Sequence, residues 1–324
     1  MPAASSPRAA LPARDELSVA RALSGGSLAA ALLLALGSCN LHVIAAAAPP
    51  EAVPVPASSA PPSQAQLPAR QSGDFAFIGA FTQGGWIKGV APAGTEGLAL
   101  HGKPVEVEPD GRFFAAFDRD AAPVAELVAR RGNFPVVRRS LAISPRGWMI
   151  EHINTPFHPP KLPSAEFARI RSGELAQIGA SRRVSTDAAG WRQDFIWPVK
   201  GRVSGRFGAQ RIYQGKPGSY HSGMDIAAAQ GAPFIAPADG VVVLAASAPF
   251  TLEGNLLIID HGAGLSSAFL HASKLTVRDG DRVRQGQLIG TVGMTGRATG
   301  PHLHWALKWR EARLDPLLFV ALGN

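Results

Sequence analysis

The segment T-G-P-H-L-H-W, Thr299 to Trp305, carries two histidines separated by a single residue, His302 and His304. Side chains alternate between the two faces of a β-strand, so both imidazoles point to one face while Leu303 points to the other, toward the core. The segment therefore predicts a strand that is buried on one face and holds two imidazoles in a shared pocket on the other.

A second polar segment, H-S-G-M-D, lies upstream and offers the imidazole of His221 and the carboxylate of Asp225. A catalytic zinc ion typically takes three nitrogen or oxygen ligands and leaves a fourth position for water. His221, Asp225 and His304 can supply that set, which leaves His302 free to transfer protons. We therefore expect one Zn²⁺ per chain, with one open coordination position.

Each of these residues also has a purely structural interpretation. His221 and Asp225 could form a surface ion pair, because residues four apart share one face of a helix. Gly223 and the strand pattern around it oppose a helix at this place. The two C-terminal histidines could be surface residues of an edge strand. We expect His261, in I-I-D-H-G, to be a turn residue and not a ligand.

The strand pattern extends over residues 195–324. Apolar runs such as G-V-V-V-L-A-A and N-L-L-I-I-D-H alternate with turn sequences such as H-G-A-G and R-D-G-D. Strands this frequent leave almost no room for crossover helices, which favours an antiparallel sheet or a barrel. Residues 195–324 are therefore predicted to be an all-β domain that contains every candidate metal ligand.

Residues 73–158 show a similar pattern without the polar clusters. Runs such as F-A-F-I-G-A-F and P-V-V-R-R-S-L-A-I are broken by turn signals, among them P-D-G-R at Pro109 to Arg112. We predict a small β-sandwich here. Its histidines are too isolated in the sequence to suggest chemistry, so its role is open.

Residues 159–194 are expected to connect the two β domains through a short helix. Ser164 is a suitable N-cap, and Phe167, Ile170 and Ile178 follow at roughly helical spacing. Gly173 weakens the case for one unbroken helix. The sequence does not decide whether this helix packs across the domain junction or blocks the cleft.

The N-terminal residues 1–48 are typical of an export signal. Three arginines precede the apolar run Leu28 to Leu36. The L-G-S-C that ends at Cys39 resembles a bacterial lipobox, whose cysteine is lipidated, and cleavage within Ala45 to Ala48 is the alternative. We expect export to the periplasm or cell envelope, with membrane attachment through Cys39 if the lipobox is used.

Composition supports an envelope location. Residues 49–72 are rich in proline and alanine and are expected to form a disordered tether. A single cysteine excludes an internal disulfide framework and a cysteine-based zinc site. The net charge of +8 indicates attraction to anionic surfaces. No nucleic-acid-binding motif is present, so anionic wall polymer or lipid headgroups are favoured over DNA or RNA.

Six motifs in a fixed order carry a family resemblance over about residues 196–319. They are H-S-G-M-D, A-P-A-D-G-V-V, I-I-D-H-G, F-L-H-A-S, V-R-D-G-D-R-V-R-Q-G-Q-L-I-G and G-R-A-T-G-P-H-L-H-W. Together they resemble the LytM/lysostaphin-type zinc metallopeptidases, which are peptidoglycan endopeptidases. The family often has a tyrosine where this sequence has Phe269, so any help from a phenolic hydroxyl at that position is absent.

The resemblance also implies roles for single residues. It implies that His221, Asp225 and His304 bind zinc and that His271 and His302 are the catalytic pair. His302 would carry protons between water and the leaving amine, and His271 would orient the water or stabilise developing charge. The structural alternative for His271 is a satisfied histidine at the end of an apolar strand.

The substrate class implied by the resemblance is the peptide stems of peptidoglycan, cut at their cross-links. Arg206 and Arg211 lie where a substrate carboxylate could be met, and solvated surface arginines are the alternative. Two other functions stay open. One is a non-enzymatic module that binds the wall or activates other hydrolases, and the other is a zinc protease that acts on a protein substrate.

Overall fold

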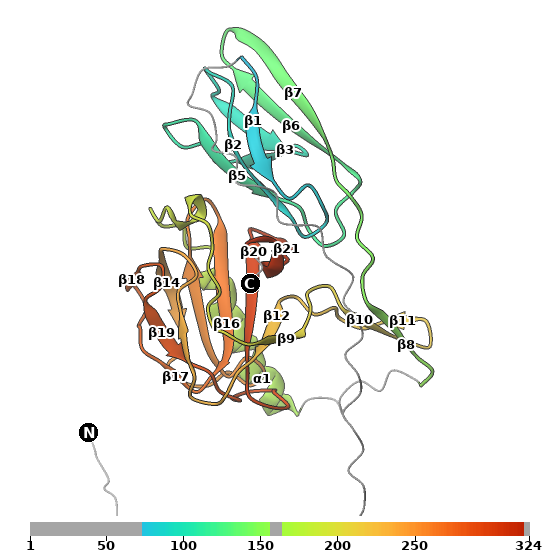
Figure 1. Cartoon of the computed structure of the whole chain (residues 1–324), viewed down its shortest axis with the longest axis vertical. Coiled ribbons are helices and arrows are strands. Elements are labelled where there is room, and N and C mark those ends of the chain that lie inside the picture. The colour runs from blue at the N-terminus through green and yellow to red at the C-terminus, as the bar shows by residue number, and fades with distance from the viewer. Residues whose placement is uncertain (1–72, 156–163, 321–324) are drawn as a thin grey trace, which may run out of the picture. The chain divides into compact units, whose positions relative to one another are not determined.

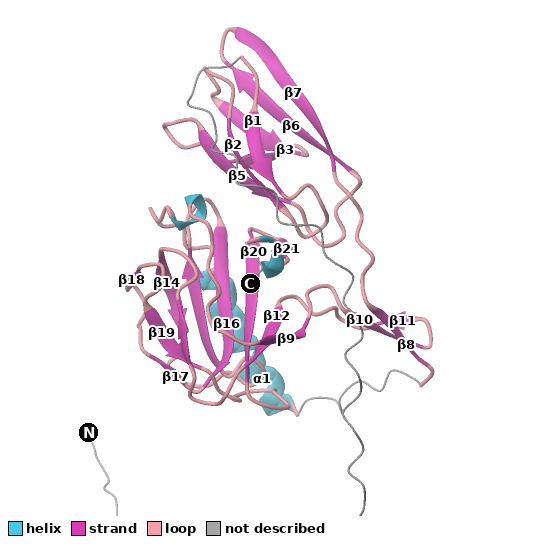
Figure 2. Cartoon of the chain, viewed as in Figure 1, coloured by secondary structure: helices cyan, strands magenta, loops and turns pink. Residues whose placement is uncertain are grey.

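The computed structural model describes residues 73–155 and 164–320. Short β-strands dominate these ranges, and α1 (Ala165–Ser181) is their one α-helix (Figure 1). The predicted all-β fold class is confirmed (Figure 2). No helix of the described ranges is both long and apolar enough to cross a bilayer. The expected signal, Cys39 and the expected tether lie outside the described residues.

Two antiparallel sheets form the N-terminal part. One has the order β1-β2-β5 and the other the order β4-β3-β6-β7. Their strands are β1 (Ala76–Gly79), β2 (Trp86–Val90), β3 (Gly97–Leu100), β4 (Lys103–Val105), β5 (Arg112–Ala116), β6 (Val124–Arg131) and β7 (Phe134–Ala142). Ile87 and Phe113 of the first sheet and Leu127 of the second are fully buried in one apolar cluster, as in a small sandwich.

Strand pairing joins this part to the C-terminal residues. β8 (Ile150–Ile153) lies parallel to β10 (Gln210–Tyr213), which also pairs with β11 (Lys216–Pro217). The β8–β10 pair is the one parallel pair among the named strands of the described ranges. Backbone hydrogen bonds therefore link the end of the N-terminal segment to the region just before the H-S-G-M-D motif.

An eight-stranded sheet organises the C-terminal domain, with the order β18-β14-β15-β16-β20-β12-β9 and β21 paired to β20. Its strands are β9 (Arg202–Gly205), β12 (Met224–Ala227), β14 (Gly240–Ala245), β15 (Asn255–Asp260), β16 (Leu265–Ala272), β18 (Arg282–Val283), β20 (His302–Trp309) and β21 (Ala312–Leu314). A smaller sheet contains β13 (Pro233–Ile235), β19 (Leu288–Thr291) and β17 (Lys274–Leu275). The large sheet is antiparallel and open, so of the two expected forms it is the sheet and not the closed barrel.

The two faces of this sheet have different neighbours. Leu303 and Phe269 are fully buried on one face, within the main apolar core. The other face carries a smaller cluster around Phe250 and Ala268, against which Ile178 of α1 packs. Because side chains alternate along a strand, His304 lies on the same face of the sheet as α1.

Helix α1 is unbroken through Gly173. The Ser164 Oγ accepts a hydrogen bond from the Phe167 N–H at 3.1 Å, which is the predicted N-cap. A Cβ on Gly173 would meet no atom within 4 Å, so nothing around the helix requires glycine there. The helix is therefore continuous, and it packs against the face of the large sheet that carries the Phe250 and Ala268 cluster.

Candidate active site

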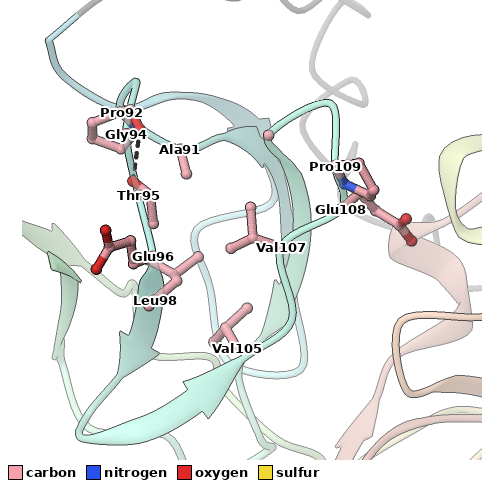
Figure 3. Close-up of a pocket in the computed structure, with 12 residues that line it drawn as sticks. Ala91, Pro92, Gly94, Thr95, Glu96, Leu98, Val105, Val107, Glu108 and Pro109 are labelled. Atoms are coloured by element: carbon pink, nitrogen blue, oxygen red, sulfur yellow. Dashed lines mark hydrogen bonds between the residues drawn. The ribbon is translucent and has the colours of Figure 1, made fainter. Parts of the chain in front are cut away.

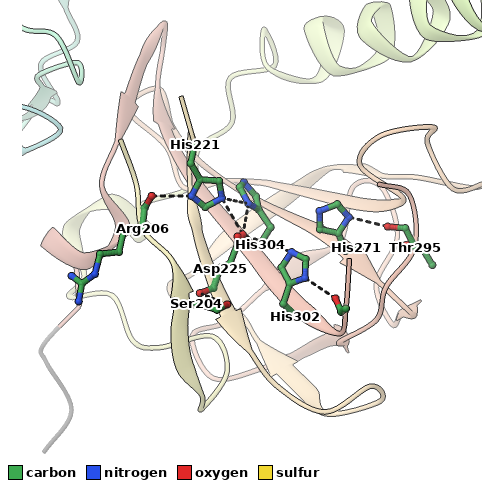
Figure 4. A network of polar contacts seen from close by, with 9 residues as sticks. Ser204, Arg206, His221, Asp225, His271, Thr295, His302 and His304 are labelled. Carbon is green, nitrogen blue, oxygen red and sulfur yellow. Dashed lines mark hydrogen bonds and ion pairs between the residues drawn. The ribbon is translucent and has the colours of Figure 1, made fainter. Parts of the chain in front are cut away.

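The register of three adjacent strands brings the expected metal ligands together. In the sheet, β20 lies between β12 and β16, and His304 is directly opposite both Asp225 and Leu270. His221 precedes β12 and turns its imidazole toward the same point (Figure 4). The Asp225 Oδ1 lies 3.1 Å from the His221 Nε2 and 2.8 Å from the His304 Nδ1, and the two nitrogens are 3.1 Å apart.

The chemistry of this donor set fits a divalent cation. The His221 Nδ1 donates to the Arg206 carbonyl at 3.0 Å, because a carbonyl can only accept. The Nε2 of that ring therefore keeps its lone pair and faces the carboxylate. Two imidazole nitrogens and a carboxylate oxygen that converge on one point are typical zinc ligands. A surface ion pair between His221 and Asp225 alone does not describe this arrangement, since His304 is its third member.

Burial and hydrogen bonding set the charges of the three groups. Burial alone would raise the pKa of Asp225, but the adjacent imidazoles of His221 and His304, which donate to the carboxylate when protonated, outweigh it and hold the pKa well below the usual range. Burial lowers the pKa of His304. It also acts to lower the pKa of His221, yet the hydrogen bond to Asp225 raises that pKa overall. At neutral pH the site therefore presents an ionised carboxylate and a neutral, deeply buried imidazole.

The other two histidines flank this set. The rings of His271 and His302 have centroids 4.9 Å apart. The Nδ1 of His302 donates to the Gly300 carbonyl at 2.8 Å, and the Nδ1 of His271 donates to the Thr295 carbonyl at 2.8 Å. Both rings therefore keep a bare Nε2. Burial lowers the pKa of His271, so its ring is neutral at pH 7.

The backbone at His271 is in the left-handed region, with a φ of 66°. For a bulky residue such a conformation costs about 1–3 kcal/mol, and it persists only when its surroundings fix it. The turn also breaks the strand alternation, so that the consecutive residues Leu270 and His271 both line the same pocket. Phe269 is fully buried and stacks on Phe234, with the ring centroids 5.6 Å apart. The position at which the family often has a tyrosine is therefore part of the core in this chain.

The pocket around these side chains has a volume of about 380 Å³. Its lining includes Arg297, a residue that the sequence analysis did not single out although it stands in the same G-R-A-T-G-P motif. Arg206 contributes only its backbone carbonyl to the site, and Arg211 donates to Glu151 at 2.7 Å. Arg297 is therefore the one arginine or lysine of the described ranges that lines this pocket.

His261 has a structural role that is more specific than a turn. Its side chain is fully buried, its Nδ1 donates to the Asp239 carbonyl at 2.7 Å and its Nε2 accepts from the Ser267 hydroxyl at 2.8 Å. Burial lowers its pKa to about 4. It directly follows β15 and links the residue before β14 to Ser267 of β16, and it is not among the converging ligands.

A second pocket, of about 270 Å³, lies in the N-terminal β domain (Figure 3). Glu96 and Glu108 are its charged lining residues, and the others are small, apolar or hydroxylated. None of the candidate ligands or catalytic histidines lines it. All five candidate ligands and catalytic histidines line the first pocket, on the C-terminal sheet.

Residues 219–316, which include all five candidate residues, match the model of Peptidase family M23. These residues are an M23 peptidase domain. The predicted resemblance to LytM-type peptidases is thus confirmed. A crystal structure of an M23-type peptidase from Pseudomonas aeruginosa has a fold similar to that of this chain, with a TM-score of 0.56 and 29% identity over 74% of this chain and 94% of that one.

Two relatives with similar sequences have names that refer to peptidoglycan or to the enzymes that hydrolyse it. The peptidoglycan DD-endopeptidase ShyA of Vibrio cholerae is 41% identical over 114 residues, which are 34% of this chain and 26% of that protein. The murein hydrolase activator NlpD of Escherichia coli is 35% identical over 136 residues, which are 42% of this chain and 32% of that protein. The chain spans no more than about a third of the length of these relatives.

Proposed function

We propose that the chain is an exported, zinc-dependent endopeptidase that hydrolyses peptide cross-links of peptidoglycan. The observation that carries the proposal is the convergence of His221, Asp225 and His304 on one point, flanked by the bare Nε2 atoms of two further imidazoles. The likeness to a DD-endopeptidase supports the substrate class. A likeness to a murein hydrolase activator supports the alternative of a non-enzymatic activator.

His221, Asp225 and His304 would hold the zinc ion. When bound, zinc supplies a Lewis acid that makes hydroxide available at neutral pH and polarises the scissile carbonyl. The Arg206 carbonyl fixes the tautomer of His221, so that the Nε2 lone pair faces the metal position. The ionised state of Asp225 at neutral pH lets the carboxylate act as a ligand without first losing a proton.

His302 is assigned to proton transfer. Its Nδ1–H is committed to the Gly300 carbonyl, so its Nε2 can accept a proton from the attacking water. The imidazolium that results can give this proton to the amine as the C–N bond breaks. The Nε2 lies 3.7 Å from the Asp225 Oδ1, whose negative charge stabilises the protonated ring.

His271 is assigned to orientation of the water. Its Nδ1–H is committed to the Thr295 carbonyl, and burial keeps the ring neutral, so its Nε2 can only accept a hydrogen bond. A neutral ring in this tautomer suits an attacking water better than it suits a developing oxyanion, which needs a donor. Of the two roles that the resemblance left open for His271, we therefore favour orientation of the water over stabilisation of developing charge.

The test combines zinc content with muropeptide release. The wild-type chain is expected to contain about one zinc ion and to release stem peptides from purified sacculi. His302→Ala is expected to keep the metal and to lose activity by about 10²–10⁴-fold. His152→Ala changes an exposed histidine outside the domain and serves as the control. A chain without zinc and without release would favour the activator, and zinc with cleavage of a protein but not of the wall would favour the protein-directed protease.

Export is part of the proposal and rests on residues 1–48. Mass analysis of the mature chain from the envelope fraction distinguishes a lipidated Cys39 from cleavage within Ala45 to Ala48. A full-length chain that stays in the cytoplasm would contradict export.

A further inference from the structure

Both hydrogen bonds that His271 donates end on loops outside its own strand, and one of these loops contacts α1. The His271 N–H donates to the Glu253 carbonyl at 2.9 Å, and its Nδ1–H donates to the Thr295 carbonyl. Residues 250–254 form a tight loop, which Phe250 and Gly254 close by reciprocal backbone hydrogen bonds of 2.8 and 2.9 Å. This loop lines the pocket through Glu253. The position of His271 therefore depends on where the 250–254 loop is held.

Helix α1 holds that loop at two points. Arg171 donates both terminal nitrogens to the Glu253 carboxylate, at 2.6 and 2.8 Å. Glu174, one turn further along the helix, accepts from the Thr251 N–H at 2.6 Å and from the Thr251 hydroxyl at 2.7 Å. Arg171 also donates to Glu174 at 2.9 Å, so the two anchors form one network.

The network is shielded from solvent. The side chains of Arg171 and Glu253 are each 17% exposed, and that of Glu174 is 8% exposed. A bidentate arginine–carboxylate pair fixes the direction as well as the distance of its partner. Exposed single ion pairs contribute little, but a partly buried network of this kind can hold a loop in place.

The second contact of His271 is tied to the same loop. The Arg297 N–H donates to the Leu252 carbonyl at 2.9 Å, and the Asn255 N–H donates to the Thr295 hydroxyl at 2.9 Å. The segment that carries the Thr295 carbonyl is therefore hydrogen-bonded to residues 252–255 and, through the Thr295 hydroxyl, to the Ala272 carbonyl at 2.9 Å. A displacement of the loop would shift the Glu253 carbonyl directly and would strain the contacts that hold the Thr295 carbonyl.

We propose that Arg171 is a positioning residue for His271, which it holds in its left-handed conformation through Glu253 and the 250–254 loop. Only the expected effect of Arg171 on the reaction rate rests on the proposed function, and its effect on the position of His271 does not. Helix α1 lies before residues 219–316, the part of the chain that matches the family model. The connector of this chain is thus a structural part of its active site.

Arg171→Met is the variant that tests the inference, and Arg169→Met is its matched control on an exposed position of the same helix. In the full chain with ¹⁵N-labelled histidine, the His271 Nδ1 is expected to show the protonated form in the wild type and in Arg169→Met. In Arg171→Met this signal is expected to move toward the average of the two tautomers. Zinc content is expected to stay at the wild-type value, because none of the three proposed ligands contacts the network.

The kinetic arm uses a cross-linked muropeptide. Arg171→Met is expected to lower kcat by about 10-fold or more with KM within about twofold, because a displaced His271 affects the attacking water and not substrate binding. Arg171→Lys keeps the charge and should restore part of the rate. Glu253→Gln should give a loss that is not additive with that of Arg171→Met, because both remove the same pair.

A folded Arg171→Met protein with the wild-type His271 signal would overturn the inference, whatever the activity. If the wild-type chain cleaves no muropeptide, the proposed function fails, and the nitrogen signal still decides whether Arg171 positions His271. If Arg171→Met does not fold, the signal and the rate of Arg171→Lys decide instead, and values equal to the wild type would overturn the inference.

Discussion

Gly223 lies directly against the imidazole of His304. A Cβ built on Gly223 would stand 2.6 Å from the His304 Nε2 and 2.7 Å from the Trp305 carbonyl oxygen. Both distances are far inside van der Waals contact. The glycine of the H-S-G-M-D motif is therefore needed for the close approach of β20 to the start of β12, and its small size lets His304 sit beside Asp225.

Gly223→Ala is expected to weaken zinc binding by at least about 10-fold, because the added methyl group displaces His304. Gly300→Ala is the control, since a Cβ on Gly300 would meet no atom within 4 Å. Zinc affinity measured by competition with a chelator checks both variants. Equal affinity in Gly223→Ala and the wild type would show that β20 can shift without loss of the site.

Arg297→Met is expected to act on substrate binding. The guanidinium of Arg297 lines the pocket, is exposed, and makes no side-chain hydrogen bond or ion pair within the described ranges. It is therefore available for a carboxylate next to the scissile bond. We expect KM to rise about 10-fold, equivalent to about 1.4 kcal/mol, for a muropeptide with a free carboxylate there.

An amidated muropeptide serves as the matched substrate, because it has no negative charge at that position. Its KM should be the same for Arg297→Met and the wild type. Arg211→Met controls for net charge, since Arg211 is paired with Glu151 outside the pocket. An equal rise of KM for both substrates would contradict a carboxylate-specific role.

Stability is expected to fall as the pH drops from about 6.5 to about 4, because of His261. The folded pKa of His261 is lowered from 6.5 to about 4, so in this window the unfolded chain takes up a proton that the folded chain does not. The contribution lost is on the order of 3 kcal/mol. Urea unfolding of the full chain at several pH values measures it.

His261→Gln removes the titrating group and keeps a polar side chain. Its free energy of unfolding should be lower than that of the wild type at pH 7 and should fall less steeply between pH 6.5 and 4. The same slope in both proteins would assign the acid sensitivity to other groups.

Phe269→Tyr is expected to destabilise the domain without raising the rate. Phe269 is fully buried against Phe234 in the core, so a hydroxyl group there would lie among apolar side chains. An unpaired buried hydroxyl costs about 1–3 kcal/mol. Thermal unfolding and muropeptide cleavage of the variant check both parts, and a faster enzyme of wild-type stability would contradict the prediction.

The strand pattern was sufficient to predict the all-β class and the placement of His302 and His304 on one face of a strand, and the N-cap preference of serine predicted the start of α1 at Ser164. These features are local, because each depends on side-chain alternation or on a hydrogen bond within one helical turn. The burial of Leu303 between the two histidines follows from the same alternation. The sequence also identified H-S-G-M-D as a second polar segment.

Other features could not be read from local patterns. The left-handed backbone at His271 breaks the alternation, so strand period alone would not place His271 in the same pocket as its neighbour Leu270. His261 looked like a turn residue because its two partners, Asp239 and Ser267, are supplied by other segments. The anchoring role of Arg171 depends on Glu253, which is far away in the sequence.

The sequence by itself determined which residue types were available for metal binding and proton transfer, since motif order and strand period depend only on neighbouring residues. The tertiary structure alone decided which atoms meet. The register of β12, β20 and β16 sets the Asp225–His304 contact, and the packing of α1 decides what holds the loop behind His271. Both depend on pairings between segments that are distant in the chain, and burial then sets the charge of each group.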